Sequence, residues 1–303
     1  MFRTILVKKA SKLQYIQGYL VIYDGDIERK VFLSDISILM IEATGSIITF
    51  PLLIELVKHN VTVIFCDEKH SPFGTILGLS NNYNNYGNIE KQLEWKEETI
   101  EIFWKLIVEQ KIYMQSCVLK MFNKDNKNNI LDDYCKGVQL LDKTNREGLA
   151  AKVYFAELFG KNFNRSEQSL INSLLDYGYT ILLTCFNREI VSSGYLTQLG
   201  IFHKGKTNPY NLSSDFMEPF RPVVDILVMI NFKENDPLKR IRKLLTKKII
   251  INDEERYMDD AIRVYTNQLI RYLNHETKVL PVMKLKKLEH YSYDESNEIN
   301  NNV

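Results

Sequence analysis

The amino-acid sequence predicts an α+β protein in which a small, β-sandwich-like N-terminal domain precedes a larger all-α C-terminal domain. Three observations lead to this prediction. Short runs of β-branched and aromatic residues fill the first 80 positions, and stretches with helical periodicity fill most of the chain after position 89. An Asn-rich segment lies between the two parts. Because strands and helices do not alternate along the chain, we do not expect a doubly wound α/β enzyme.

The N-terminal domain is expected at residues 1–80. Runs of β-forming residues predict its strands, which include 4–7, 19–23, 31–33 and 61–65. Asp24-Gly25, between two such runs, is the two-residue signal of a tight β-hairpin. One helix, from about residue 46 to 60, interrupts the strands, and Pro51 must lie in or near its first turn.

The helical domain is expected at residues 90–289, after a linker at 81–89. The tail at 290–303 is polar and acidic and ends in an Asn run, so we expect it to be disordered. Apolar periodicity predicts helical segments at 89–122, 129–141, 145–160, 166–199, 216–232, 237–249 and 253–275.

Composition and charge narrow the function. The chain has 303 residues with 39 Lys and Arg against 38 Asp and Glu, a formal net charge of +1. The protein is not globally basic, so any nucleic-acid binding must depend on local patches. No apolar run reaches the roughly 18 residues that span a bilayer, and we find no signal peptide. The four cysteines are isolated, which indicates free thiols in a reducing cytoplasm.

Residues 200–207 match the phosphate-binding loop pattern GxxxxGK(S/T). The pattern binds phosphate where a buried strand precedes the loop and a helix follows it. Here the preceding segment looks helical, and Asn208-Pro209-Tyr210-Asn211 forms a turn where the helix should begin. A P-loop NTPase is therefore the weakest of the functional interpretations.

A first group of metal-binding residue types, Cys66, Asp67 and His70, lies just after a predicted strand. No further ligand follows at a regular spacing, so a polar loop is the better interpretation.

A stronger candidate for metal chemistry includes His203. Two carboxylates, Asp215 and Glu218, follow it three residues apart at a predicted helix start, and Glu147 opens an earlier helix. One imidazole and two carboxylates from separate helices suit Mg²⁺ or Mn²⁺. The same glutamates also stand at capping-box spacing, as in Thr144 to Glu147, where they would bond to free N–H groups. On spacing alone, helix caps are the favoured interpretation.

The densest basic segment lies at residues 237–249. Asp236 followed by Pro237 is typical of a helix start, and an apolar stripe would leave the charges mostly on the other side. By itself the pattern indicates a solvated helix face that carries Lys239, Arg240, Arg242, Lys243, Lys247 and Lys248.

Three segments around the candidate ligands resemble one known family as a set. They are REGLAAKVYF around Glu147, LTQLGIFHKGKTNPYNLSSDF through His203, and SSDFMEPFRPVVD through Glu218. Their order is similar to that of the CRISPR-associated adaptation integrases, the Cas1 family, and most similar to the type II branch, II-A within it. The resemblance covers nearly the whole chain.

The resemblance implies a metal-dependent DNA integrase and endonuclease with a helical catalytic domain. Such an enzyme inserts a captured DNA, the prespacer, into a CRISPR array as a DNA 3′-hydroxyl attacks the repeat strand. Glu147, His203 and Glu218 would be the ligands of one Mg²⁺ or Mn²⁺, and Asp215 a further catalytic acid lining the site. One phosphodiester replaces another and DNA supplies the nucleophile, so neither ATP nor a nucleophilic side chain is needed.

The resemblance also implies partners. Prespacer and CRISPR leader-repeat DNA would contact Lys204, Lys206, Arg221 and the basic segment, mainly through backbone phosphates. The β-rich domain would be a dimerisation domain, and two homodimers would flank a central dimer of the small protein Cas2. The type II RNA-guided nuclease and a ring-shaped protein that binds DNA ends are further expected partners in the cytoplasm, and no membrane is involved. The alternative is a non-catalytic DNA-binding scaffold in which Glu147 and Glu218 only cap helices.

Overall fold

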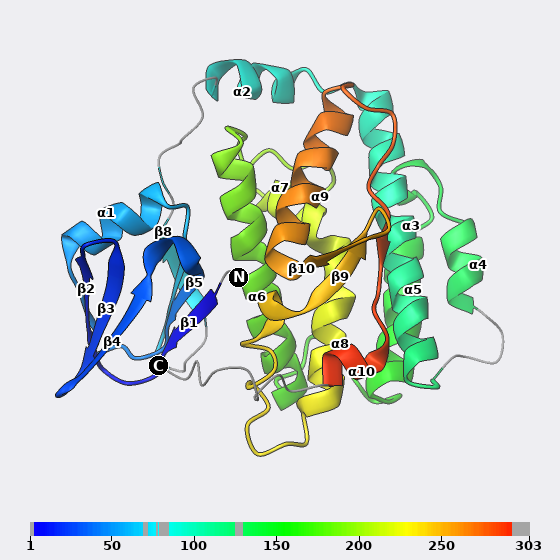
Figure 1. The fold of residues 1–303 in the computed structure, drawn as a ribbon. Coiled ribbons are helices and arrows are strands. Elements are labelled where there is room, and N and C mark those ends of the chain that lie inside the picture. Colours follow the sequence, from blue (N-terminus) through cyan, green and yellow to red (C-terminus); the bar gives the residue numbers. More distant parts are fainter. Residues whose placement is uncertain (1–2, 69–71, 77, 79–84, 125–129, 293–303) are drawn as a thin grey trace. The chain divides into compact units, whose positions relative to one another are not determined.

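The computed structural model describes residues 3–68, 72–76, 78, 85–124 and 130–292. The chain divides into two compact units, the first reaching residue 81 and the second beginning at residue 82 (Figure 1). The first unit is rich in strands and the second in helices. The predicted α+β class is therefore confirmed.

The N-terminal unit contains two four-stranded sheets. Its strands are β1 Arg3–Val7, β2 Lys12–Ile16, β3 Tyr19–Asp24, β4 Ile27–Phe32, β5 Ile36–Ile41, β6 Ile47–Ile48, β7 Thr62–Cys66 and β8 Pro72–Ile76. One sheet has the order β1-β5-β7-β8, in which β8 alone is antiparallel to its neighbour. The other has the order β4-β3-β2-β6, in which β4, β3 and β2 are antiparallel.

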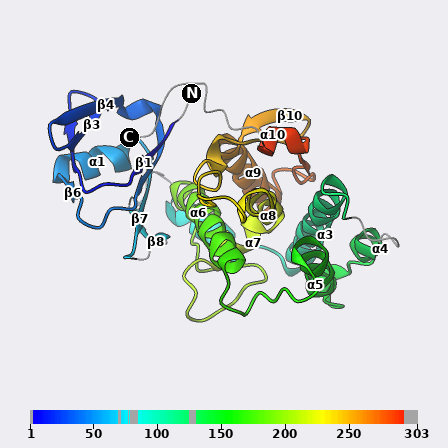
Figure 2. The same cartoon turned by 90° about the horizontal axis from the view of Figure 1, so that it is seen from below.

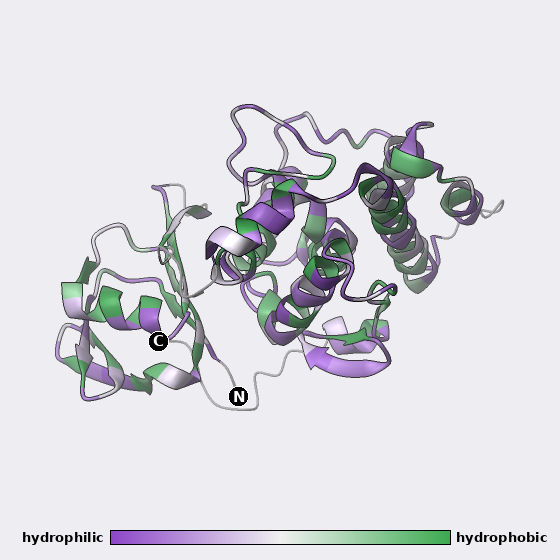
Figure 3. Cartoon of the chain, turned by 90° about the horizontal axis from the view of Figure 1, so that it is seen from above, coloured by the Kyte–Doolittle hydropathy of each residue, from purple (hydrophilic) through white to green (hydrophobic). Residues whose placement is uncertain are grey.

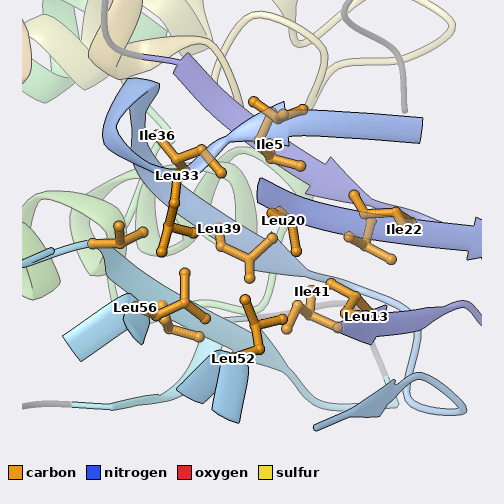
Figure 4. Close-up of a cluster of buried hydrophobic side chains, with 14 residues drawn as sticks. Ile5, Leu13, Leu20, Ile22, Leu33, Ile36, Leu39, Ile41, Leu52 and Leu56 are labelled. Carbon is orange, nitrogen blue, oxygen red and sulfur yellow. The ribbon is translucent and has the colours of Figure 1, made fainter. Parts of the chain in front are cut away.

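Both sheets share one hydrophobic core with helix α1, Phe50–Lys58. Figure 4 shows Ile5 from β1, Leu20 from β3, and Leu52 and Leu56 from α1 within this cluster. Two sheets that enclose one apolar layer are the arrangement expected of a sandwich-like domain.

Two local predictions in this unit are confirmed. Strands β3 and β4 form the predicted hairpin, and its two-residue loop is Gly25-Asp26, because Asp24 still pairs with Ile27. Gly25 has a φ of +61°, which glycine adopts without a steric penalty. Pro51 lies in the first turn of α1, where a backbone N–H would have no helical partner.

The second unit is built around its longest helix, α3. Its helices are α2 Asn85–Leu93, α3 Glu97–Met121, α4 Ile130–Lys136, α5 Arg146–Phe159, α6 Leu170–Ser192, α7 Asn211–Met217, α8 Arg221–Asn231, α9 Met258–Leu273 and α10 Leu288–Ser292. Helices α4, α5, α8 and α9 contact α3, and Figure 2 shows α5 beside it. Hydrophilic and hydrophobic residues alternate along the helices (Figure 3), as in amphipathic helices that bury one face.

The prediction of an all-α C-terminal domain is wrong in one respect. Strands β9 (Lys248–Ile251), β10 (Glu254–Tyr257) and β11 (Met283–Lys284) form a sheet in the order β10-β9-β11. The helix predicted at 237–249 is replaced by turns, a short 3-10 helix at Leu244–Thr246, and β9. The consecutive isoleucines of β9 favour a strand, and it finds partners on both sides.

Other predicted boundaries also differ. The helix expected at 89–122 is two helices, and α2 begins inside the segment expected as a linker. The helix expected at 216–232 is divided by a 3-10 helix, Glu218–Phe220, because Pro219 starts a new turn. Helix α10 covers the first residues of the tail expected to be disordered, and residues 293–303 lie outside the described part.

Residues 200–207 do not follow a strand and do not lead directly into a helix, as a phosphate-binding loop would. Helix α6 ends at Ser192, residues 193–210 contain turns and bends without a strand, and the next helix begins at Asn211.

Of the first group of metal-binding residue types, Cys66 ends β7 and His70 lies outside the described residues. Among the helices that the structure describes, none is long and apolar enough to cross a membrane.

Candidate functional site

Glu147 lies in the first turn of α5, but its side chain does not cap that helix. Asn145 is the N-cap residue, and its side chain accepts a hydrogen bond from the Gly148 N–H at 3.2 Å. The carboxylate of Asp142 accepts from the N–H groups of Arg146 and Glu147 at 2.8 and 2.9 Å. The capping-box interpretation of Glu147 is therefore wrong, because other residues satisfy the start of the helix.

Lys111 of α3 joins Glu147 to Glu218. Its Nζ donates to Glu147 Oε1 at 2.6 Å and to Glu218 Oε2 at 2.5 Å. Lys111 and Glu218 are buried, with 8% and 3% of their surfaces exposed. Lys111 belongs to no motif, and its signal in the sequence is a lysine within the apolar periodicity of α3, four residues after Ile107.

Arg221 holds the other oxygen of Glu218. Arg221 Nε donates to Glu218 Oε1 at 2.9 Å, and the guanidinium lies 4.7 Å from the centre of the Tyr179 ring. Burial acts to raise the pKa of Glu218, but the positive charges of Arg221 and Lys111 lower it to about 2. Glu218 is thus an ionised carboxylate with both oxygens in use at neutral pH.

Asp215 fixes the loop that carries His203. Its carboxylate is fully buried and accepts hydrogen bonds from three successive backbone N–H groups, those of Ile201, Phe202 and His203. It also pairs with His203 Nδ1 at 2.7 Å. The second cap expected from spacing is therefore wrong as well, because the Asp215 carboxylate binds the preceding loop instead of its own helix.

The bond to Asp215 also sets the chemistry of His203. It raises the pKa of His203, and the charges of Glu218 and Glu147 raise that pKa further. Because Nδ1 is engaged, Nε2 is the ring nitrogen left for an ion or a substrate. The structure thus brings Glu147, His203 and Glu218 into one region and places Asp215 behind His203, where it is a positioning residue.

Two aromatic rings support the same loop. Phe202 stacks on Trp104 of α3, with ring centres 4.4 Å apart and an angle of 5° between the rings. The His203 ring meets both of them edge-on at 5.9 Å. Because Trp104 is fully buried, the His203 loop is fastened to the helix that also carries Lys111.

A buried carboxylate lies behind Arg221. Asp225 of α8 accepts hydrogen bonds from Tyr154 of α5 at 2.8 Å and from Tyr179 of α6 at 2.5 Å. Burial raises the pKa of Asp225 to about 6. Since Tyr179 also lies against Arg221, this cluster ties three helices to the residue that holds Glu218.

Glu147, His203 and Glu218 are residue types that bind divalent cations, but their side chains are not arranged around one ion position in this structure. Two carboxylates and one imidazole are ligands that Mg²⁺ and Mn²⁺ accept. Within the described residues, however, no three His, Cys, Asp or Glu side chains are grouped closely enough to hold an ion. The Lys111 ammonium stands between Glu147 and Glu218, which shows that a positive charge is favoured there.

The basic residues nearest to His203 in the sequence differ in their surroundings. Lys204 and Lys206 are exposed on the loop that follows His203. Arg221, in contrast, is engaged by Glu218 and by the Tyr179 ring. The two lysines are therefore the ones that can meet a large ligand without breaking an existing pair.

The basic segment is less available than its composition suggests. Arg240 and Arg242 form ion pairs with acidic neighbours, at 3.5 Å to Glu234 and 3.2 Å to Asp236. Lys247 is buried, with 5% of its surface exposed. The other members of the predicted set are exposed or half-buried, namely Lys239, Lys243 and Lys248.

The sequence is similar to one family of proteins. The family model described as "CRISPR associated protein Cas1" matches residues 5–256. The chain is 34% identical over 238 residues to the CRISPR-associated endonuclease Cas1 of Neisseria meningitidis serogroup C, and the match covers 78% of each chain. It is 28% identical over 258 residues to the CRISPR-associated endonuclease Cas1 2 of Saccharolobus solfataricus, again over 78% of each.

Solved structures share the fold. A casposase bound to integration product has a TM-score of 0.75 and 22% identity, over 92% of both chains. A Cas1 protein from Thermotoga maritima has a TM-score of 0.66 and 16% identity, over 90% of this chain and 97% of that one. A Cas6-RT-Cas1–Cas2 complex has a TM-score of 0.66 and 17% identity, over 95% of this chain and 37% of that one.

Proposed function

The chain belongs to the Cas1 family of CRISPR-associated proteins, and on that premise we propose that it is a metal-dependent DNA integrase and endonuclease. It inserts prespacer DNA into a CRISPR array as a DNA 3′-hydroxyl attacks a phosphodiester of the repeat. The observation that carries the proposal is that Glu147 and Glu218, from separate helices, meet at one cationic group with His203 close by.

In this proposal the protein supplies positioned charge and no nucleophile. The attacking and leaving oxygens both belong to DNA, and one phosphodiester replaces another, so the reaction needs no ATP. Glu147, His203 and Glu218 would hold Mg²⁺ or Mn²⁺, an ion that polarises the scissile phosphate and orients the attacking hydroxyl. Exposed Lys204 and Lys206 would bind the phosphates of the target strand.

Neighbouring residues keep the three ligands in place. Asp142 binds the backbone at the start of α5, and thereby fixes the turn that carries Glu147. Asp215 directs the His203 ring through Nδ1. Arg221 engages Oε1 of Glu218 and thereby holds the orientation of that carboxylate. Ligands that are held in this way can act without reorganisation during the reaction.

We assign the chain to the type II branch, and to II-A within it, on the resemblance of the segments around Glu147, His203 and Glu218, and Glu218 in place of the shorter Asp of many family members agrees with that branch. Its proposed partners are prespacer and leader-repeat DNA, a second copy of this chain and a central dimer of Cas2. The names of two structures with this fold, a casposase bound to integration product and a Cas6-RT-Cas1–Cas2 complex, support DNA and Cas2. The RNA-guided nuclease and the DNA-end-binding ring protein follow from the type II assignment, and the cytoplasm follows from the isolated cysteines.

His203→Ala tests the proposal in a strand-transfer assay with Mn²⁺, a labelled prespacer and a target that contains a CRISPR repeat. We expect the joined product to disappear while the thermal unfolding curve stays close to that of the wild type, because the His203 side chain is 38% exposed. His59→Ala, at an exposed histidine of the N-terminal unit, is the matched control and should join normally. Normal joining by His203→Ala would end the proposal.

The structure gives one argument for the alternative, a non-catalytic DNA-binding scaffold. Lys111 and Arg221 already balance the charges of Glu147 and Glu218, so these residues form an ion-pair network in the structure. A scaffold predicts that the wild-type protein binds DNA but yields no joined product at any Mn²⁺ concentration. The same assay with wild-type protein therefore separates the two functions.

A further inference from the structure

The proposed reaction does not explain why Lys111 lies between the two glutamates. Its ammonium bridges the two carboxylates, Glu147 and Glu218, that we take to be metal ligands. We propose that Lys111 is a positioning residue that holds these ligands together in the metal-free protein and is displaced when a divalent cation enters. This inference rests on the proposed function, because it takes both glutamates to be ligands.

The Lys111 ammonium and an entering divalent cation would compete for the carboxylate of Glu218. Arg221 Nε bonds to Oε1 at 2.9 Å, and Lys111 Nζ bonds to Oε2 at 2.5 Å, so each oxygen already has a cationic partner. A divalent cation held by Glu218 and the ammonium bonded to the same carboxylate would both be positive and would repel each other. This repulsion makes the two cations compete for Glu218.

Lys111 is the more easily displaced of the two basic residues at Glu218. A lysine carries a point charge on a flexible four-carbon stem, whereas the guanidinium of arginine is a planar fork that stacks on aromatic rings. Arg221 uses this property, because it lies 4.7 Å from the centre of the Tyr179 ring. We therefore assign displacement to Lys111 and retention to Arg221.

The metal-free protein needs a cation at this position. Glu218 is buried and would keep Arg221, but removing the ammonium would leave its charge and that of Glu147 without the cation that they share. Uncompensated buried charge is strongly destabilising. The ammonium thus keeps the two glutamates at their spacing. Displacing the ammonium costs free energy, and this cost lowers the net affinity of the site for the entering ion.

Lys111→Met tests the inference, because methionine has a stem of similar length and no charge. Isothermal titration of MnCl₂ into the DNA-free full chain should give a Kd lower than that of the wild type by about tenfold or more, because the entering ion no longer displaces a paired ammonium. Mn²⁺ should also raise the Tm of this variant by more than it raises that of the wild type. Lys111→Arg retains the charge and should bind Mn²⁺ no more tightly than the wild type.

Lys105→Met, at a half-buried lysine on the same helix, is the matched control and should leave the Kd unchanged. If Lys111→Met does not fold, Lys111→Gln is titrated instead, since its amide still donates to carboxylates without a charge, and the same tightening is expected. An equal or weaker affinity in the neutral variant overturns this inference and leaves the proposed function standing. Absence of Mn²⁺ binding in both wild type and variant overturns the two together.

Discussion

Replacing Asp225 with Asn should remove a pH dependence from the stability of the helical unit. Asp225 is buried, with 1% of its surface exposed, and its oxygens accept hydrogen bonds from Tyr154 and Tyr179. Burial raises the pKa of Asp225 from its ordinary value of 3.8 to about 6, because the charged form is poorly solvated. Asn has the same shape, and a tyrosine hydroxyl can donate to its oxygen or accept from its amide.

The sign and the size of the effect follow from that pKa. Because folding raises it, the stabilising contribution of Asp225 is fully present below about pH 4 and is lost as the pH rises through about 6. At about 1.4 kcal/mol per pH unit, the change from 3.8 to about 6 corresponds to roughly 3 kcal/mol. Between about pH 4 and pH 7, the wild type should lose most of this amount relative to the Asn variant.

Urea unfolding followed by tryptophan fluorescence measures this difference. Both tryptophans of the chain, Trp95 and Trp104, lie in the helical unit, so their signal reports on that unit. The free energies of unfolding of the wild type and Asp225→Asn should diverge with rising pH. Asp176→Asn, at an aspartate whose side chain is 65% exposed, should follow the wild type. Parallel curves for the wild type and Asp225→Asn would refute the reasoning.

Two further predictions concern elements next to this cluster. Gly178→Ala should destabilise the helical unit by about 1–3 kcal/mol, because an added Cβ would lie 2.4 Å from Val224 Cγ1, between α6 and α8. The same urea titration measures this destabilisation. A variant as stable as the wild type would contradict the prediction, because it would show that the space between α6 and α8 accommodates a methyl group. Asp215→Asn should lower the pKa of His203, because the Asp215 hydrogen bond is the largest cause of its increase. An NMR titration of the His203 ring measures this change, and an unmoved midpoint would contradict it.

The parts of the site that the sequence predicts are those with local signatures. Glu147, His203 and Glu218 each stand in a motif of the chain and could be selected without coordinates. Lys111 could not, because it meets Glu147 and Glu218 across 36 and 107 residues of the chain. A single sequence has no signal for a contact over such separations, since periodicity marks only which face of α3 is buried.

Two local predictions are wrong because a local pattern has more than one possible outcome. The spacing from Thr144 to Glu147 matches a capping box, but Asp142 and Asn145 have φ values of +48° and +51°, and these residues cap α5 instead. The basic segment has helical periodicity, yet its last two residues, Lys248 and Ile249, begin strand β9 and pair with β10. In the first case neighbouring residues compete for the same N–H groups, and in the second strand pairing outweighs a local helical preference. The division into a strand-rich and a helix-rich unit was predictable because the composition of the chain itself changes.

The ammonium between the two carboxylates also affects the order of events in the life of the protein. In small zinc domains the binding energy of the metal is the folding energy, so the chain cannot fold until the ion arrives. Here the neutralising charge belongs to the same chain, and the helices pack around an apolar interior. Under the proposed function, folding of the helical unit and loading of an ion would therefore be separable steps. The folded protein would gain, lose or exchange its ion without passing through an unfolded state.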